Sequence, residues 1–410
     1  MISQGGLAEE TLAVVLAGGK GTRHGPLTRH VCKPALPFGA AYRNIDFSLA
    51  NCVNSGIRHV GVATQHNPES LLRHLDRAWA KAARRSGEFI TAWPAEERAP
   101  AGGYRGTADA VFRNLDLIGR ENKALALVLA GDHVYRMDYR PMLEFHRSRC
   151  ADVTVGCIEV PAEEANQFGI LSVDRHGRIE RFVEKPRTPE GLPAGKRVLA
   201  SMGIYVFDTP FLARVLRRDS ALPGSRHDFG GDILPSLLRE ARLYAYRFAH
   251  GAGGTESAYW RDVGTPTAYW RAHLELLADA PAFCLDDAGW PLPAVTAKPM
   301  LTARHSRPSP ERSWSRSLIA AGCEVSGVVH QSVLFSDVCV EAGSQIERSV
   351  VLPGAVIGRN CRITGAIVDS GCRIPRGTVI GASCGAGASR EEPVVVTAAD
   401  FAAEAVPAYA

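Results

Sequence analysis

Several features that would classify this 410-residue chain at once are missing. No run of about 18 apolar residues occurs, which excludes a membrane-spanning helix, and Met1 to Thr11 lacks the basic and apolar segments of a secretory signal. The 10 cysteines never stand in Cys-x-x-Cys spacing, and their scatter is typical of a reducing compartment. We therefore expect a cytoplasmic protein with no membrane partner.

A strong net charge is also missing. The 47 Lys and Arg residues outnumber the 43 Asp and Glu residues by only four, so the composition gives no reason to expect a nucleic-acid partner. The same balance permits a phosphorylated substrate held by a few local cations. With 46% hydrophobic and 22% charged residues, disordered and fibrous classes are excluded, and the length predicts two or three domains.

Short apolar runs alternate with amphipathic stretches from about residue 11 to residue 280. Such runs are typical of strands covered on both faces, and the stretches between them have helical periodicity. The predicted strands are Leu12–Ala17, Val60–Thr64, Leu125–Ala130, Val153–Val160 and Ile204–Phe207, and the predicted helices are Ser70–Arg85 and Tyr139–Arg147. The alternation predicts an α/β layer with a mostly parallel sheet.

A proline-rich stretch and a short repeat follow. Prolines between residues 291 and 317 mark an extended connector, and beyond it β-branched residues recur every six positions with two slips to five. They are Val340, Ile346, Val351, Ile357, Ile363, Val368, Ile374 and Ile380. A β-sandwich would alternate with period two, so the repeat predicts a parallel β-helix instead. The expected domains are 1–290, the connector 291–317, and 318–410.

The glycine-rich segment after the first predicted strand is the strongest local signal. It reads Leu16-Ala17-Gly18-Gly19-Lys20-Gly21-Thr22-Arg23, which fits neither the Walker spacing nor Gly-x-Gly-x-x-Gly. Glycines let backbone N–H groups approach a phosphate chain, and the Lys and Arg of the segment add positive charge. A plain strand-to-helix turn would use glycines too, but Lys33 supplies a further cation, which polyphosphate binding requires.

Two carboxylates are candidates for holding a metal ion. Asp132 follows the apolar run that ends at Ala130, and the carboxyl ends of strands in open α/β sheets face the ligand crevice. Asp262 lies in Tyr259-Trp260-Arg261-Asp262-Val263-Gly264-Thr265. Mg²⁺ is commonly held by one or two carboxylates together with substrate phosphates, so the pair fits that ion. A lone Asp at a strand end would more often be a turn or cap residue.

Two further segments carry polar groups suited to a sugar phosphate. In Phe182-Val183-Glu184-Lys185-Pro186, the lysine could hold a monoester phosphate and the glutamate could accept sugar hydroxyls. An exposed ion-paired turn is the plainer interpretation of this pair. The segment from Gly102 to Ala110 is a glycine turn that runs into a helix start, where Thr107 or Asp109 could simply cap the helix.

These motifs together resemble the sugar nucleotidyltransferases, and most closely the ADP-glucose pyrophosphorylase (glucose-1-phosphate adenylyltransferase) family. The resemblance extends from about residue 12 to residue 400. It rests on the glycine-rich segment and Lys-Pro-Ala, and on Tyr104 to Ala110, Ala130 to His133, Phe182 to Pro186, Ala200 to Tyr205, His227 to Gly230 and Tyr259 to Thr265. It implies a Rossmann-like catalytic domain, a C-terminal left-handed parallel β-helix and a homotetramer.

The resemblance also implies a reaction and its residues. ATP and α-D-glucose 1-phosphate would give ADP-glucose and pyrophosphate, with Mg²⁺ on Asp132 and Asp262 and with Arg23 and Lys33 as further catalytic residues. The implied nucleotide-binding residues are Leu16, Ala17, Gly18, Gly19, Gly21, Thr22, Arg23, Lys33, Gln65, Gly106 and Thr107. The implied glucose 1-phosphate residues are Tyr104, Gly169, Glu184, Lys185, Ser201, Tyr205, Asp228, Phe229 and Trp260.

Most departures from the family pattern lie at residues implied to take part in regulation. His30 and Val31 stand where relatives carry effector-binding cations, and Glu96 and Glu97 replace two glutamines. Arg43, Arg120 and Arg390 remain as candidate effector residues, His24 replaces a leucine, and Gly103 replaces a tryptophan. We therefore expect weakened control by sugar bisphosphates. The alternatives are a non-catalytic subunit of the same fold, a transferase for another nucleoside triphosphate, and an acyltransferase with His330 as base.

Overall fold

The chain divides into two compact units in the computed structural model. The model describes residues 6–80, 89–99, 102–187, 197–248, 258–292, 300–301, 314–381 and 392–404. The first unit consists of Met1–Gly19, Ser48–Gly131 and Arg136–Ala258, and the second consists of Lys20–Phe47, Asp132–Tyr135 and Tyr259–Ala410. Each unit therefore collects segments that are far apart in the sequence.

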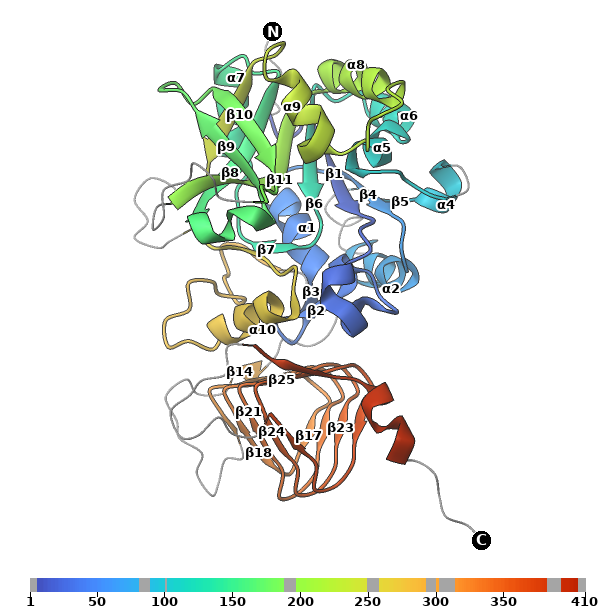
Figure 1. The fold of residues 1–410 in the computed structure, drawn as a ribbon, viewed down its shortest axis with the longest axis vertical. Coiled ribbons are helices and arrows are strands. Elements are labelled where there is room, and N and C mark those ends of the chain that lie inside the picture. The colour runs from blue at the N-terminus through green and yellow to red at the C-terminus, as the bar shows by residue number, and fades with distance from the viewer. Residues whose placement is uncertain are drawn as a thin grey trace. The chain divides into compact units, whose positions relative to one another are not determined.

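A nine-stranded sheet forms the centre of the first unit (Figure 1). Its main path runs in the order β10-β9-β11-β6-β1-β4-β5, with β8 paired to β11 and β12 paired to β8. The strands are β1 (Thr11–Ala17), β4 (His59–Thr64), β5 (Phe89–Pro94), β6 (Leu125–Ala130), β8 (Val153–Pro161), β9 (Gly169–Val173), β10 (Ile179–Glu184), β11 (Arg197–Asp208) and β12 (Leu243–Arg247). All five predicted strands are confirmed.

Strand direction differs between the two halves of this sheet. β6, β1, β4 and β5 are parallel to one another, as the alternation of runs predicted. The long strand β11 is antiparallel to β6, β8 and β9, and β10 is antiparallel to β9. The predicted α/β fold class is confirmed, and the antiparallel half around β11 is an addition that the sequence reading did not anticipate.

Helices cover the sheet of the first unit. They are α2 (Glu69–His74) with a π-helical continuation at Leu75–Ala80, α4 (Ala95–Arg98), α5 (Thr107–Phe112), α6 (Leu115–Arg120), α7 (Arg140–Ser148), α8 (Thr209–Ser220), η4 (Ala162–Gln167), η5 (Phe229–Ile233) and α9 (Leu234–Leu237). α5, α6 and α8 pack on the sheet face that carries Leu12, Val14 and Val128. The predicted helix at Tyr139–Arg147 is confirmed as α7, and the described part of the predicted Ser70–Arg85 helix is α2 and its continuation.

The second unit joins short elements to a β-helix. The short elements are η1 (Thr22–Thr28), η2 (Lys33–Ala35), β2 (Pro37–Phe38), β3 (Tyr42–Arg43), β7 (His133–Tyr135), β13 (Trp260–Asp262) and α10 (Pro266–Glu275). α1 (Asn44–Asn54) begins in this unit and ends in the first. Buried residues of α10, such as Trp270, share one apolar core with Val333 and Val350 of the β-helix. Trp270 also donates from Nε1 to the carbonyl of Arg348 at 2.6 Å.

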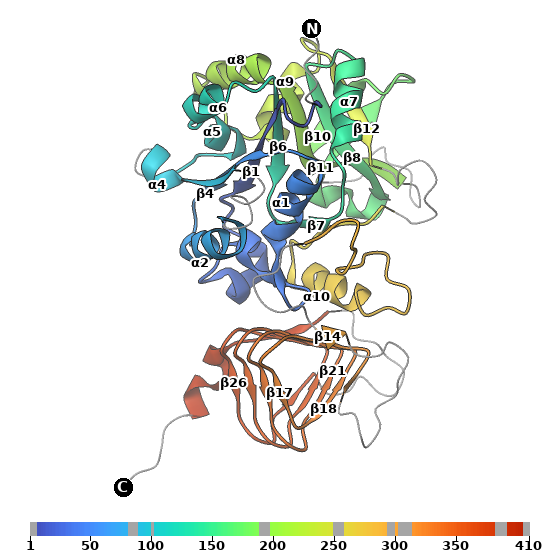
Figure 2. The same cartoon turned by 180° about the vertical axis from the view of Figure 1, so that it is seen from behind.

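Three parallel sheets wind into the β-helix (Figures 1 and 2). The strands are β14 (Met300–Leu301), β15 (Trp314–Ser315), β16 (Leu318–Ile319), β17 (Glu324–Val325), β18 (Val328–His330), β19 (Val333–Leu334), β20 (Cys339–Val340), β21 (Gln345–Glu347), β22 (Val350–Val351), β23 (Val356–Ile357), β24 (Arg362–Thr364), β25 (Ala366–Val368), β26 (Arg373–Ile374), β27 (Val379–Ile380) and β28 (Val394–Val396), followed by η6 (Ala398–Glu404). β14 alone among them pairs antiparallel. The predicted left-handed β-helix is confirmed.

The spacing of the repeat follows from the coil. Stacked residues such as Ile346 and Ile363 pair directly, and Ser349 and Ser332 occupy one place on successive coils, 17 residues apart. Two faces of six residues and one of five make up that period, which explains the slips to five. At the five-residue corner, Gln331, Arg348 and Gly365 all have positive φ. A single left-handed residue turns the chain there, although non-glycine residues rarely adopt this conformation.

No helix in the part of the chain that the structure describes is long and apolar enough to cross a membrane. The predicted connector 291–317 lies largely outside the described residues, which there comprise 291–292, 300–301 and 314–317.

Candidate functional site

The glycine-rich segment leaves the end of β1, where Leu16 and Ala17 belong to the strand. Gly18 and Gly19 are the last residues of the first unit, and the segment continues in the second unit with Lys20. Gly21 has φ 64° and precedes η1, and its carbonyl accepts a hydrogen bond from Thr28 Oγ1 at 2.9 Å. The turn therefore favours glycine at position 21, since a side chain at this φ would be strained and its Cβ would lie 3.0 Å from Thr28 Cγ2.

A buried lysine joins two carboxylates in the second unit. Lys33 Nζ lies 2.9 Å from Asp132 Oδ2 and 2.7 Å from Asp262 Oδ1. β13 pairs with β7 so that Asp262 stands opposite His133, the residue after Asp132. Arg23 approaches Asp262 Oδ2 at 3.5 Å. The four implied catalytic residues thus meet in one place, which we call the lysine–aspartate cluster: Arg23, Lys33, Asp132 and Asp262.

Electrostatic interactions keep the buried groups of this cluster charged. Desolvation opposes the charge of Lys33, but the two carboxylates outweigh it and raise the pKa of the lysine above its usual value. Burial also opposes ionisation of Asp132 and Asp262, and the nearby Lys33 nevertheless lowers the pKa of both carboxyl groups. At neutral pH the cluster therefore holds two carboxylates and an ammonium group within hydrogen-bonding distance.

His24 lies next to the lysine–aspartate cluster. Its ring is fully buried, and burial, together with the nearby Lys33, lowers the pKa of His24 to about 4, so the imidazole is neutral at pH 7. Nε2 lies 2.6 Å from the carbonyl of Val263, to which a neutral imidazole donates. This histidine, at a position where the resemblance implies leucine, links η1 to the residue after Asp262. Sequence reasoning had assigned it no role.

The carboxylates fit a hard divalent cation. Lys33 contacts Asp132 Oδ2 and Asp262 Oδ1. The second oxygens of the two carboxylates have longer contacts, 3.6 Å from Asp132 Oδ1 to His133 Nε2 and 3.5 Å from Asp262 Oδ2 to Arg23, and they are further oxygen donors of the pair. The described residues contain no group of three or more His, Cys, Asp and Glu side chains suited to a metal. Two carboxylates without a full protein cage suit an ion that keeps water and binds substrate phosphates, as Mg²⁺ does.

Polar side chains gather on β9, β10 and β11 in the first unit. Glu184 stands opposite Gly169 in the β10–β9 pair, and a Cβ on Gly169 would lie 2.8 Å from Glu184 Oε2. Ser201 Oγ and the Tyr205 hydroxyl are 3.4 Å apart on β11. The ring of Phe229 lies 5.6 Å from that of Tyr205. These five residues, with Lys185 and Asp228, form what we call the sugar-side cluster.

Lys185 lies at the open edge of this cluster. Its side chain is 57% exposed, and Nζ contacts Glu184 Oε1 at 2.9 Å. The residue has φ 44°, directly after the end of β10, and its amide donates to the carbonyl of Phe168. The exposed ammonium group of Lys185 is accessible to a phosphate, which matches the role implied for it. The carboxylate of Glu184 faces Gly169 and can accept hydrogen bonds from sugar hydroxyls, which matches its implied role.

Thr107 joins α5 to the sugar-side cluster. Its hydroxyl lies 2.9 Å from Asp228 Oδ2 and accepts a hydrogen bond from the amide of Phe229 at 3.0 Å. Asp228 Oδ1 in turn accepts from the amide of Gly231 and caps η5. The helix start at Gly106 and Thr107, implied to bind nucleotide, is therefore bonded directly to a loop implied to bind sugar.

The structure groups the remaining predicted residues differently. The Tyr104 hydroxyl donates to the carbonyl of Trp93 and accepts from Asn114, and its backbone carbonyl accepts from Gln65. Tyr104 thus lies with Gln65 and not with Glu184, so its hydroxyl is already engaged. Trp260 belongs to the second unit, where its ring lies 4.9 Å from that of His133.

The candidate effector arginines are dispersed. Arg43 lies in β3 of the second unit, whereas Arg120 ends α6 of the first unit with a 76% exposed side chain. Arg390 lies outside the described residues. Glu96 and Glu97, the departures from the family pattern, are exposed on α4. Nothing in the described residues gathers these groups into one place within a unit.

Comparison with known proteins assigns the family. The nucleotidyl transferase family matches residues 12–279, and a GlmU-like C-terminal hexapeptide family matches residues 301–395. Glucose-1-phosphate adenylyltransferase of Methylococcus capsulatus is 46% identical over 92% of this chain and 89% of the relative. A second enzyme of that name, from Alkalilimnicola ehrlichii, is 47% identical with the same coverage, and one from Granulibacter bethesdensis is 46% identical over 92% of both chains.

The fold and the clusters around Lys33 and Glu184 thus define a nucleotidyl transferase that carries a hexapeptide-repeat region. Nucleotidyl transferases of this kind generally use a divalent metal ion. Within that class, the chain belongs to the family of the glucose-1-phosphate adenylyltransferases.

Proposed function

We propose that this chain transfers the adenylyl group of ATP to α-D-glucose 1-phosphate, giving ADP-glucose and pyrophosphate for α-glucan synthesis. The reaction is the one for which its relatives are named. The structural observation that carries the proposal is the convergence of Asp132 and Asp262 on Lys33, because a transfer between phosphates needs fixed charges of both signs. A non-catalytic subunit would have no need to keep this cluster complete.

The reaction is an in-line displacement. A phosphate oxygen of the sugar phosphate forms a bond to the α-phosphorus of ATP. At the same time the bond from that phosphorus to the oxygen that bridges the α- and β-phosphates breaks, and pyrophosphate leaves with the electron pair. Lys33 and Arg23 offset the charge of the phosphates, and Asp132 and Asp262 would hold Mg²⁺. The bound ion would withdraw charge from the leaving pyrophosphate. No covalent enzyme intermediate is required.

The sugar-side cluster binds the acceptor in this proposal. Lys185 pairs with the monoester phosphate of glucose 1-phosphate, and Glu184 and Asp228 accept hydrogen bonds from sugar hydroxyls. Ser201 and Tyr205 contribute hydroxyl groups, while the ring of Phe229 and the bare backbone at Gly169 shape the wall. Positioning of the acceptor oxygen contributes to the rate because it makes the reaction of the two bound substrates effectively unimolecular.

The proposal extends to the domain boundaries, the oligomeric state, the cellular location and the allosteric control of the chain. We propose a catalytic domain at 1–290, a connector at 291–317, a β-helix domain at 318–410, and a cytoplasmic homotetramer. Arg43, Arg120 and Arg390 are proposed effector contacts, with weakened activation because His30 and Val31 replace cations. Light scattering of the purified chain tests the tetramer, and a large activation by fructose 1,6-bisphosphate would contradict the weakened control.

One assay tests the reaction. The purified chain is incubated with glucose 1-phosphate, Mg²⁺ and each nucleoside triphosphate in turn, and released pyrophosphate is measured. ATP is expected to be the preferred donor. Preference for another nucleotide would replace the donor in the proposal, and no pyrophosphate with any donor would favour the non-catalytic subunit.

A further inference from the structure

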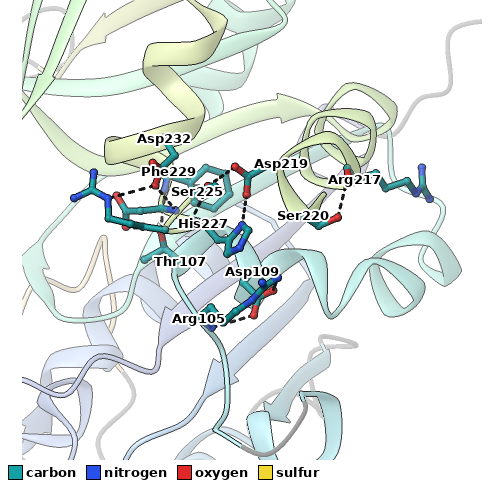
Figure 3. Close-up of polar contacts among 12 residues, drawn as sticks. Arg105, Thr107, Asp109, Arg217, Asp219, Ser220, Ser225, His227, Phe229 and Asp232 are labelled. Carbon is teal, nitrogen blue, oxygen red and sulfur yellow. Dashed lines mark hydrogen bonds and ion pairs between the residues drawn. The ribbon is translucent and has the colours of Figure 1, made fainter. Parts of the chain in front are cut away.

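Three polar side chains form a closed ring behind the loop that carries Asp228. Asp219, at the end of α8, accepts from Ser225 Oγ at 2.6 Å and from His227 Nδ1 at 2.7 Å. The amide of His227 then donates to Ser225 Oγ at 2.9 Å, which closes the ring. Figure 3 shows the contacts of Asp219 with Ser225 and His227 as dashed lines. We call this group the loop clasp: Asp219, Ser225 and His227.

The backbone of His227 needs such support. Its φ is 56°, a left-handed conformation that non-glycine residues keep only where the surrounding structure enforces it. Open surface pockets of 670 and 360 Å³, both lined in part by Ser225, border the loop, so solvent reaches that side of it. The side chains of His227 and Asp219 are nevertheless only 4% and 9% exposed. Hydrogen bonds between buried side chains therefore fix the conformation.

The conformation of His227 aligns two functional segments. Its carbonyl accepts from the amides of Ala108 at 2.8 Å and Asp109 at 3.4 Å, in the first turn of α5. The next residue, Asp228, meets Thr107 of the same turn. The approach is so close that a Cβ on Gly106 would collide with the carbonyls of Arg226 and His227. A rotation of the backbone at His227 would therefore have two effects at once. It would move Asp228 away from Thr107, and it would break the hydrogen bonds from the first turn of α5 to the carbonyl of His227.

We propose that the loop clasp is a positioning device for the sugar phosphate: Asp219, Ser225 and His227 set the place of Asp228 without touching the substrate themselves. This inference rests on the proposed function, in which Asp228 binds the sugar. It assigns a role in acceptor binding to the end of α8, which none of the sequence motifs includes. The clasp acts on glucose 1-phosphate more than on ATP, because Asp228 is its nearest functional side chain.

Variants of the clasp test this role. Asp219→Asn and His227→Ala are expected to raise the KM for glucose 1-phosphate by about tenfold or more, with a smaller rise in the KM for ATP, since small displacements at a binding group reduce the rate strongly. His227→Asn should recover most of the loss, because asparagine tolerates a positive φ and its amide can donate to Asp219. Asp219→Asn, which keeps the side-chain shape, carries the test if His227→Ala fails to fold.

Two controls separate positioning from general stability. His146→Ala removes another buried histidine of the first unit, whose Nδ1 lies 2.8 Å from Thr154 Oγ1, and should lower the melting temperature without changing either KM. Equal rises in both KM values, or a lower melting temperature with unchanged KM values, would overturn the clasp. Asp228→Ala separates the two proposals: if it leaves the KM for glucose 1-phosphate unchanged, the proposed sugar site fails, whereas an effect of Asp228→Ala alone rejects only the clasp.

Discussion

The two units build their functional clusters by opposite means. In the second unit, Lys33 is 6% exposed and is held between two carboxylates whose pKa values it lowers. In the first unit, Lys185 is 57% exposed, and the cluster behind it depends on bare backbone at Gly169 and Gly230 beside Glu184. Buried charge requires a fixed partner, whereas an exposed cation is available to a ligand from outside. The first arrangement suits charge stabilisation, and the second suits capture of a substrate.

The largest expected effect concerns the buried charges. Asp262→Asn removes one carboxylate that compensates Lys33 and holds the proposed metal ion, so kcat should fall about 10³-fold, a cost of about 4 kcal/mol in the transition state. Steady-state kinetics with saturating substrates measure this loss. Arg261→Gln, at the neighbouring exposed position, is the matched control and should retain activity. A normal kcat for Asp262→Asn would remove the proposed contrast between the units.

A buried neutral histidine makes the second unit sensitive to acid. Burial lowers the pKa of His273 to about 4 from its usual 6.5, with Nε2 accepting from the amide of Gly39. Between these values the unfolded chain binds more protons than the folded chain, so stability is lost as pH falls from 6.5 towards 4, by up to about 3 kcal/mol. Melting temperatures measured across that range should fall less steeply for His273→Gln. Equal slopes would show that His273 does not contribute.

The exposed cation of the first unit should affect binding more than turnover. Lys185→Ala is expected to raise the KM for glucose 1-phosphate by ten- to a hundredfold, about 1.4–2.7 kcal/mol, because one charge-assisted contact to the phosphate is lost. The KM for ATP and the melting temperature should change little. Lys185→Arg keeps the charge and serves as the comparison. A main effect on kcat would assign Lys185 to the chemistry and not to capture.

The smallest effect concerns close approach. A Cβ at Gly230 would collide with Glu184 Oε2, which lies at the end of a flexible side chain, so Gly230→Ala should displace Glu184 without unfolding the unit. The KM for glucose 1-phosphate should rise severalfold, roughly 1 kcal/mol. Gly119→Ala meets nothing within 4 Å and is the control. If both substitutions are silent, the bare backbone beside Glu184 has no part in binding.

Sequence patterns predicted what depends on local periodicity and on contiguous motifs. The runs of β1 and β6 and the six-residue repeat gave the strands and the β-helix, because burial on both faces and a recurring inward residue leave a direct signature. The antiparallel half around β11 left no such signature, since apolar runs do not record strand direction. For the sites, contiguous motifs marked Lys33, Asp132 and Asp262 individually, and only the structure shows that they converge.

Residues that act through the backbone were not predictable. His24 departs from the family pattern as a single substitution, and its bond to the carbonyl of Val263 joins positions 239 residues apart. Asp219 lies on a helix outside every motif, and its partners come from a loop whose path the sequence does not specify. Tyr104 stands inside a motif, but burial against Trp93 turned its hydroxyl away from solvent.

The coil of the β-helix limits how this chain can change in length. An insertion of 17 residues would add one complete coil and leave every inward side chain in place, whereas one residue added within a strand would rotate all that follow to the wrong face. The first coil departs from the 17-residue period without disturbing the strands. Ser317 and Ser332 occupy the same place on successive coils but are only 15 residues apart. The first coil is two residues shorter between β17 and β18, at the corner where later coils turn at Gly343 and Asn360. Length variation among descendants of this chain should therefore concentrate at corners or come in whole coils.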